Sequence, residues 1–124
     1  NRNLTRVDNG MIVDVYIKQG DKEYYFEIKT VGPNIRGFRS HKEQVLTWVA
    51  RADKNIHAAL VLPYNPYLPN AYKRPGSEIM DFGSDLLVGK DFWDIIGGKG
   101  CYEDVEDAFK RIGGKYWAAL SKKF

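Results

Sequence analysis

Cysteine, long apolar runs and charge of one sign are all scarce in this chain of 124 residues. Cys101 is its single cysteine, which excludes an internal disulfide and a metal site built on paired cysteines. No apolar run approaches the roughly 18 residues that a membrane-spanning helix needs. The net charge of +3 permits nucleic-acid binding without demanding it. We therefore expect a cytoplasmic protein from a reducing compartment, with no membrane partner.

The rest of the composition is that of a soluble globular domain, with 44% apolar and 28% charged residues. The length favours a single domain over residues 1–124. Aromatic residues reach 14%, and we expect some of them to face a partner rather than the core. The chain begins with Asn1 instead of methionine, so we expect it to be part of a longer protein.

Two antiparallel strands are predicted near the N-terminus. Residues 11–18 (MIVDVYIK) and 23–30 (EYYFEIKT) are rich in β-branched and aromatic side chains, with a turn signal at Gln19–Asp21 between them. Pairing that is symmetric about this turn sets Asp14 level with Glu27. Alternation along a strand predicts which residues share a face. In the first strand these are Met11, Val13, Val15 and Ile17 on one face and Asp14 and Tyr16 on the other; in the second they are Tyr24, Phe26 and Ile28 on one face and Tyr25, Glu27 and Lys29 on the other.

A helix and a buried strand are predicted next. Ser40 stands three residues before Glu43, a capping box that predicts a helix over residues 41–52 after an irregular linker. Residues 56–62 (IHAALVL) have the apolar content of a central strand. Strand, helix and strand in this order indicate a right-handed crossover between parallel strands. The predicted buried stripe of the helix comprises Val45, Trp48, Val49 and Ala52.

The C-terminal half begins with residues 63–75 (PYNPYLPNAYKRP), whose prolines exclude regular structure and favour an ordered loop with exposed tyrosines. The elements predicted after it are a strand over residues 85–88, a helix over 92–96 capped by Asp91 and closed by Gly97–Gly98, a helix over 103–112 closed by Gly113–Gly114, and a last helix over 116–122. The expected fold is α/β, a mixed sheet led by the hairpin with a crossover helix and C-terminal helices.

Two carboxylates carry the chemical signal. Asp14 and Glu27 each interrupt an apolar strand, and side chains level across two strands have Cβ atoms about 4.5–5.5 Å apart. Two carboxylates at that distance repel unless a cation lies between them or one is protonated. Mg²⁺ takes oxygen ligands and usually keeps several waters. The pair therefore predicts a metal site suited to phosphodiester hydrolysis, with the Ile28 carbonyl as a further ligand.

Lys29 lies two residues after Glu27 on the same face, where its ammonium would approach the attacking water and the scissile phosphate. The alternative is a solvent-facing pair, because Glu-x-Lys also occurs by chance. The matching strand faces and the helix and buried strand that follow favour the catalytic interpretation.

At this point the sequence resembles the PD-(D/E)XK nuclease core, and more specifically the TdeIII-like type II restriction endonucleases. The resemblance covers roughly residues 10–112 and rests on Asp14, on EIKTVGPN (27–34), on LPYNPY (62–67) and on VGKDFWDIIGGKGCYEDV (88–105). It implies Mg²⁺-dependent cleavage of double-stranded DNA at a short site. Similar enzymes cut GC-rich interrupted palindromes such as GGNCC, and the resemblance implies this recognition sequence less strongly than it implies the reaction. Members of that family are longer, with an additional N-terminal, largely helical region that we expect to be missing here.

Further residues are candidates for contact with DNA. A cationic group precedes or opens the predicted helix, and the loop after the central strand carries possible base readers. The resemblance implies that a polar residue early in the helix, Gln44, reaches toward the site, and the alternative is an ordinary exposed helix residue. These candidates are Arg36, Arg39, His41, Lys42, Gln44, Tyr64 and Asn65. For the last two, a purely structural role in the loop is the favoured interpretation.

The functions that fit are thus a type II restriction enzyme, a structure-specific repair or junction nuclease, and a non-catalytic DNA-binding module on the same fold. A restriction enzyme would be expected to form a homodimer, because a palindromic target mirrors a two-fold axis.

Overall fold

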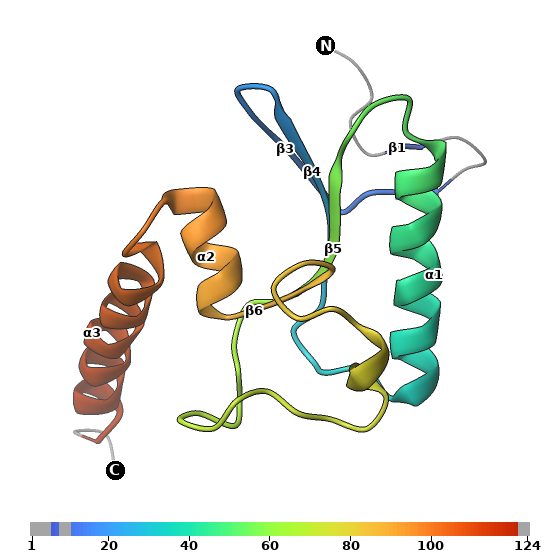
Figure 1. Cartoon of the computed structure of the whole chain (residues 1–124). Helices are drawn as coiled ribbons and strands as arrows, with labels where there is room; N and C mark the ends of the chain where they lie inside the picture. The colour runs from blue at the N-terminus through green and yellow to red at the C-terminus, as the bar shows by residue number, and fades with distance from the viewer. Residues whose placement is uncertain (1–5, 8–10, 122–124) are drawn as a thin grey trace.

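A computed structural model describes residues 6–7 and 11–121 of the chain, with side chains described for residues 13–115. Its elements, drawn in Figure 1, are β1 (Arg6–Val7), β2 (Met11–Ile12), β3 (Val15–Gln19), β4 (Lys22–Ile28), α1 (Ile35–Arg51), β5 (His57–Leu62), η2 (Ser77–Ile79), β6 (Leu86–Val88), α2 (Lys90–Gly97) and α3 (Cys101–Ser121). The main sheet has the order β3-β4-β5-β6, and β1 pairs with β2 apart from it. The expected α/β class with a mixed sheet is confirmed.

The hairpin has the predicted register. Val15 pairs with Phe26 and Gln19 with Lys22. The predicted first strand is nevertheless broken at residues 13 and 14, which separate β2 from β3. Val13 consequently packs on the α1 side of the sheet, whereas Val15 packs on the opposite side. The predicted common face of these residues was wrong, and Met11 lies outside the described side chains.

Helix α1 begins six residues earlier than its predicted start at residue 41. The N-cap is Asn34, whose Oδ1 accepts a hydrogen bond from the Gly37 amide at 2.8 Å. Gly37 permits this start, because a Cβ on it would lie 2.8 Å from the Pro33 Cβ. The capping box at Ser40 was therefore a wrong prediction, since that residue already lies inside the helix.

The buried stripe of α1 was predicted in part. Val45 and Trp48 are buried as expected, and Phe38 joins them because the helix starts earlier. Val49 is 48% exposed, against prediction. It occupies the edge of the stripe, where the helix surface turns away from the sheet.

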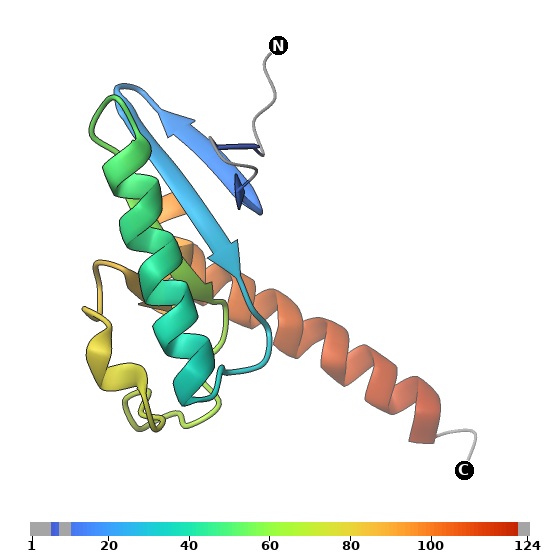
Figure 2. The ribbon, with the colours of Figure 1, turned by 90° about the vertical axis from the view of Figure 1, so that its right-hand side faces the viewer.

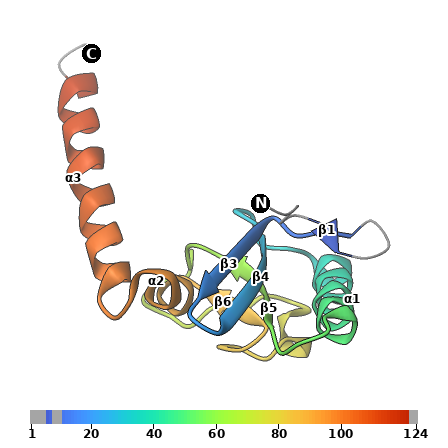
Figure 3. The same cartoon turned by 90° about the horizontal axis from the view of Figure 1, so that it is seen from above.

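The crossover is confirmed, since β5 runs parallel to β4 on one side and to β6 on the other. Helix α1 covers one face of the sheet, where it packs on β5, and α2 covers the other, where Phe92 meets Phe26 (Figure 3). This burial on both faces explains the continuous apolar run of β5. None of the helices in the described part of the chain is both long enough and apolar enough to cross a membrane.

The C-terminal helices differ from prediction in two places. The N-cap of α2 is Gly89, and Asp91 lies in the first turn instead. Helix α3 continues through Gly113 and Gly114 to Ser121, so the two predicted helices are one, which extends away from the sheet (Figure 2). A glycine inside a helix costs only about 1 kcal/mol relative to alanine, and the two glycines therefore do not end this one. The predicted stop of α2 at Gly97 is confirmed.

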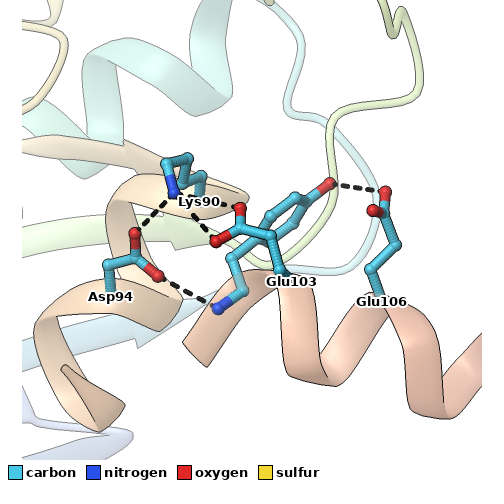
Figure 4. A network of polar contacts seen from close by, with 5 residues as sticks. Lys90, Asp94, Glu103 and Glu106 are labelled. Carbon is cyan, nitrogen blue, oxygen red and sulfur yellow. Dashed lines mark hydrogen bonds and ion pairs between the residues drawn. The ribbon is translucent and has the colours of Figure 1, made fainter. Parts of the chain in front are cut away.

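A polar network ties α3 to α2 (Figure 4). The Lys90 ammonium donates to Asp94 at 2.8 Å and to Glu103 at 3.0 Å. Asp94 also accepts from the Tyr102 amide at 3.0 Å, which satisfies a free donor in the first turn of α3. The hydrogen bond from Lys90, followed by that from the Tyr102 amide, lowers the pKa of Asp94.

Candidate active site

The bend between β2 and β3 turns Asp14 toward the end of β4. Its Oδ2 accepts a hydrogen bond from the Ile28 amide at 3.2 Å. Asp14 is exposed and lies outside both strands, although the hairpin register still sets it beside Glu27. The predicted meeting of the two carboxylates is confirmed, through a bend rather than through a continuous strand.

Glu27 is the buried member of the pair, with 9% of its surface exposed. Burial raises the pKa of its carboxyl, and so do the hydrogen bond and the negative charge of Asp14. The hydrogen bond from Gln44 and the charge of Lys29 act in the opposite direction and lower it. Because the raising effects prevail, the site favours either a proton or a cation at Glu27.

Lys29 extends the same face beyond the last residue of β4. Its amide donates to the Val61 carbonyl at 2.9 Å, which continues the parallel ladder past Ile28 and fixes the backbone. The ammonium lies 3.5 Å from Glu27 Oε2, and the side chain is 45% exposed. It therefore borders the carboxylates and solvent at once, as a group that meets a substrate must.

Gln44 completes this cluster from α1. Its Nε2 donates to Glu27 Oε1 at 3.2 Å, and its Oε1 lies 3.3 Å from His41 Nδ1. Of the two interpretations of Gln44, contact with the site is the one that this hydrogen bond favours. The sequence did not predict that His41 would face Gln44, although their spacing of three residues on one helix is the signal that could have shown it.

Replacing Gln44 by leucine is expected to move the pH dependence of any reaction that needs ionised Glu27. Loss of the Gln44 hydrogen bond removes a contact that lowers the pKa of Glu27, so the acidic limb of the pH–rate profile should shift to higher pH. We expect the rate loss to be largest at acidic pH and to shrink as the pH rises past the pKa of Glu27. The exposed neighbour Glu43, replaced by glutamine, is the control. An unchanged acidic limb would remove Gln44 from the site.

The remaining candidate residues are divided between two regions. Arg36 and Arg39 are exposed near the start of α1, and Tyr64 is 63% exposed on the loop after β5. Lys42 points elsewhere and pairs with Asp85 and Asp81, so its charge is already compensated. The prediction that Lys42 is free to meet phosphate was therefore wrong.

Asn65 has its side chain occupied within the loop. It is buried, its Oδ1 accepts from the Tyr67 amide at 2.9 Å, and its Nδ2 donates to the Asn70 carbonyl at 2.9 Å. These bonds favour the structural role over base reading, and contact with DNA stays a prediction.

The donors at the site fit a hard cation. Within the described residues, no group of three or more His, Cys, Asp or Glu side chains gathers as a metal cluster. Two carboxylates and a nearby backbone carbonyl are nevertheless the kind of partial oxygen set that Mg²⁺ accepts, because this ion retains water ligands. Zinc would be a poorer match, since the cluster supplies no cysteine and its His41 faces Gln44.

Comparison with known proteins agrees with this geometry. Residues 1–113 match the family described as type II restriction endonuclease, HinfI. The chain belongs to the HinfI family. This confirms the expected kinship with type II restriction enzymes, while the finer likeness to TdeIII stays a prediction.

Three curated relatives of this HinfI-family chain illustrate the match. Type II restriction enzyme HgiCII from Herpetosiphon aurantiacus is 27% identical over 97% of this chain and 47% of its own length. HgiEI from the same organism is 26% identical over 89% of the chain and 43% of its own length. MjaII from Methanocaldococcus jannaschii is 26% identical over 80% of the chain and 30% of its own length. The chain thus spans less than half the length of these relatives. No solved structure matches it.

Proposed function

We propose that the chain is the catalytic domain of a type II restriction enzyme, which cleaves double-stranded DNA in a Mg²⁺-dependent reaction in the cytoplasm. The observation that carries this proposal is the meeting of Asp14, Glu27 and Lys29 at the end of β4, in a chain of the HinfI family. The sheet order, with an antiparallel hairpin leading into a parallel crossover, supports a PD-(D/E)XK-type core.

Asp14 and Glu27 would hold the metal, and the Ile28 carbonyl, one residue beyond Glu27, is a further candidate ligand. When bound, Mg²⁺ supplies positive charge at the phosphate and lowers the pKa of a bound water. Ionised Glu27 is required for this, so the raised pKa of its carboxyl makes metal affinity fall toward acidic pH. The proposal therefore includes an acidic limb in the pH dependence of cleavage.

Lys29 would act on the phosphate itself. Its ammonium offers three N–H donors beside Glu27, where they can orient the attacking water and stabilise the negative charge that develops on the phosphate. Gln44 positions Glu27 through their hydrogen bond. Arg36, Arg39 and Tyr64 are exposed and available to contact DNA, and a GGNCC duplex is the first sequence to test.

A second copy of the chain is the partner that we propose for α3. The exposed Phe109 and Ile112 form an apolar stripe on this helix with Tyr102 and Val105, at intervals of three and four residues. Nothing lies within 4 Å of a Cβ built on Gly113 or Gly114, so a partner helix could approach closely there. The first half of the helix carries acidic side chains at 103, 104, 106 and 107, and the basic ones follow at 110, 111 and 115. In two antiparallel copies around a two-fold axis, the acidic half of one helix would lie beside the basic half of the other.

Phe109→Glu is expected to convert such a dimer to a monomer, because it places two like charges near the two-fold axis. Light scattering during gel filtration at about 50 μM should show the mass of two chains for the wild type and of one for the variant. Val49→Glu, at another exposed apolar position, on α1, is the control and should remain dimeric. A monomeric wild type would contradict the dimer, though not the nuclease.

Metal removal tests the proposed function directly. Cleavage of unmethylated phage DNA should stop in EDTA and return when excess Mg²⁺ is added. Cleavage that continues in EDTA would contradict a metal-dependent site at Asp14 and Glu27. DNA binding that is unaffected by Asp14→Ala and Lys29→Ala, with no cleavage by the wild type, would favour the non-catalytic binding module.

A further inference from the structure

A cavity of about 70 Å³ lies at the carboxyl ends of β4 and β5. Thr30, which directly follows Lys29, forms part of its wall, so the cavity adjoins the proposed active site. Its walls come from the segment after β4, from the end of β5 and the loop that follows it, and from the segment that leads to η2. Its lining residues are Thr30, Gly32, Leu62, Tyr64, Pro66, Tyr67, Tyr72 and Arg74. In open α/β sheets this end of the strands is where ligands commonly bind.

The Tyr72 hydroxyl is the unusual group in this cavity. The side chain is only 7% exposed, and the hydroxyl has no hydrogen-bond partner among the described residues. A buried polar group without a partner is unfavourable, so this hydroxyl favours an acceptor or donor from outside the protein chain. Glycine at position 32 lets the hydroxyl approach the backbone closely, because a Cβ there would lie 2.8 Å from the Tyr72 oxygen.

Arg74 gives the cavity its charge. Its Nε donates to the Pro33 carbonyl at 2.8 Å, which fixes the guanidinium against the cavity wall. The terminal nitrogens have no hydrogen-bond partner among the residues that the structure describes. Arg74 also borders an adjoining open cleft with Arg36 and with Asn34, the N-cap of α1. Neither lining contains an aspartate or glutamate, and the helix N-terminus adds a further preference for an anion.

We propose that this cavity is a phosphate-binding subsite, in which the Tyr72 hydroxyl and the Arg74 guanidinium hold a DNA backbone phosphate that neighbours the scissile one. The inference rests on the proposed nuclease function. Its location supports the inference, because Thr30 in the cavity wall directly follows Lys29 in the sequence. A bound water would satisfy Tyr72 alone, whereas a phosphate would accept from both the Tyr72 hydroxyl and the terminal nitrogens of Arg74.

The test is the affinity for a fluorescein-labelled 30-base-pair duplex of mixed sequence, measured in EDTA at several salt concentrations. Arg74→Gln should weaken binding about 10-fold at low salt and reduce the slope of log affinity against log salt by about one phosphate contact. Tyr72→Phe keeps the shape of the side chain and removes only the hydroxyl, so it should weaken binding by about 3-fold with little change in slope. Lys73→Gln, the exposed neighbour outside the cavity lining, is the control for loss of charge alone.

The outcomes separate the subsite from the nuclease. If the wild type binds DNA but neither Arg74→Gln nor Tyr72→Phe differs from Lys73→Gln, the cavity holds water only and the subsite is refuted. If inorganic phosphate raises the melting temperature of the wild type, Arg74→Gln abolishes this and DNA affinity stays unchanged, the site takes free phosphate rather than DNA. If the wild type does not bind duplex DNA, the proposed function fails with the subsite, whatever the variants do.

Discussion

Lys29→Ala should lower the rate of Mg²⁺-dependent DNA cleavage by about 1,000-fold, the size of effect expected when a donor to the developing negative charge is removed. The reason is its position, with the ammonium 3.5 Å from Glu27 Oε2 and nearly half of the side chain exposed toward solvent. The single-turnover cleavage rate at saturating Mg²⁺ is the measurement, because it reports the chemical step instead of product release. DNA affinity in EDTA should change much less, since one charge among several is lost.

Lys22→Ala is the matched control for that variant. Lys22 lies on the same strand, β4, at its opposite end, and it pairs with Gln19 beside the hairpin turn. Both substitutions remove one positive charge, so a general loss of attraction for DNA would affect them equally. Equal rates for the two variants would remove Lys29 from the catalytic cluster.

Glu27→Gln is expected to lower the rate of cleavage by about 1,000-fold. It is also expected to stabilise the metal-free protein at a pH above the folded pKa of Glu27. Burial and the negative charge of Asp14 raise the pKa of Glu27 in the folded state. A carboxyl with a raised pKa contributes stability below its unfolded pKa, and this stability is lost as the pH rises through the folded pKa. At a pH above the folded pKa the wild type therefore carries an unfavourable buried charge that glutamine lacks, and the variant should melt at a higher temperature in EDTA.

Added Mg²⁺ should reverse this ranking. An ion that binds the folded wild type raises its melting temperature by mass action, whereas Glu27→Gln should respond little because it lacks a carboxylate ligand. A variant that melts below the wild type in EDTA, or that gains as much from Mg²⁺, would contradict a metal site at Glu27.

Glu23 supplies a control with the opposite sign. It is a buried glutamate on the same strand, and its carboxylate is paired with Lys54 at 2.7 Å. The hydrogen bond from Lys54 lowers the pKa of Glu23 in the folded state. The ionised Glu23 carboxylate therefore stabilises the fold at a pH above its unfolded pKa, and this stabilisation is lost as the pH falls through the folded pKa. Glu23→Gln should therefore lower the melting temperature at pH 7 and leave the response to Mg²⁺ intact.

The elements with strong local signals were predictable from the sequence. The turn at Gln19–Asp21 fixed the hairpin register, and the register set Asp14 beside Glu27. The apolar run of β5 indicated a central parallel strand, which the sheet order confirms. In these segments the local pattern and the tertiary contacts favour the same structure.

Helix ends were predicted less well, because several residues can serve as caps or stops. Ser40 and Asn34 both have capping side chains, and the contact of Gly37 with Pro33 selects the earlier one. The glycines of α3 looked like a stop, yet they lack the left-handed backbone that ends α2 at Gly98. Such choices depend on tertiary packing, which the periodicity of a sequence does not contain.

The candidate site was predictable in its centre and not at its margin. Asp14, Glu27 and Lys29 lie on one hairpin, so their meeting follows from local pairing. Lys42 appeared to belong with them, but an ion pair with Asp85, distant in sequence, holds it elsewhere. The cavity with Tyr72 and Arg74 was missed for the same reason, because a loop brings these residues beside Gly32.

The most direct test of the central claim is to incubate the chain with unmethylated phage DNA and Mg²⁺ and to sequence the ends of the products. The site at Asp14, Glu27 and Lys29, in a chain of the HinfI family, predicts discrete fragments whose ends share one short sequence. Neither EDTA nor the Lys29→Ala variant should yield those fragments. Ends that follow DNA shape without a common sequence, or fragments that persist in the Lys29→Ala variant, would contradict the account.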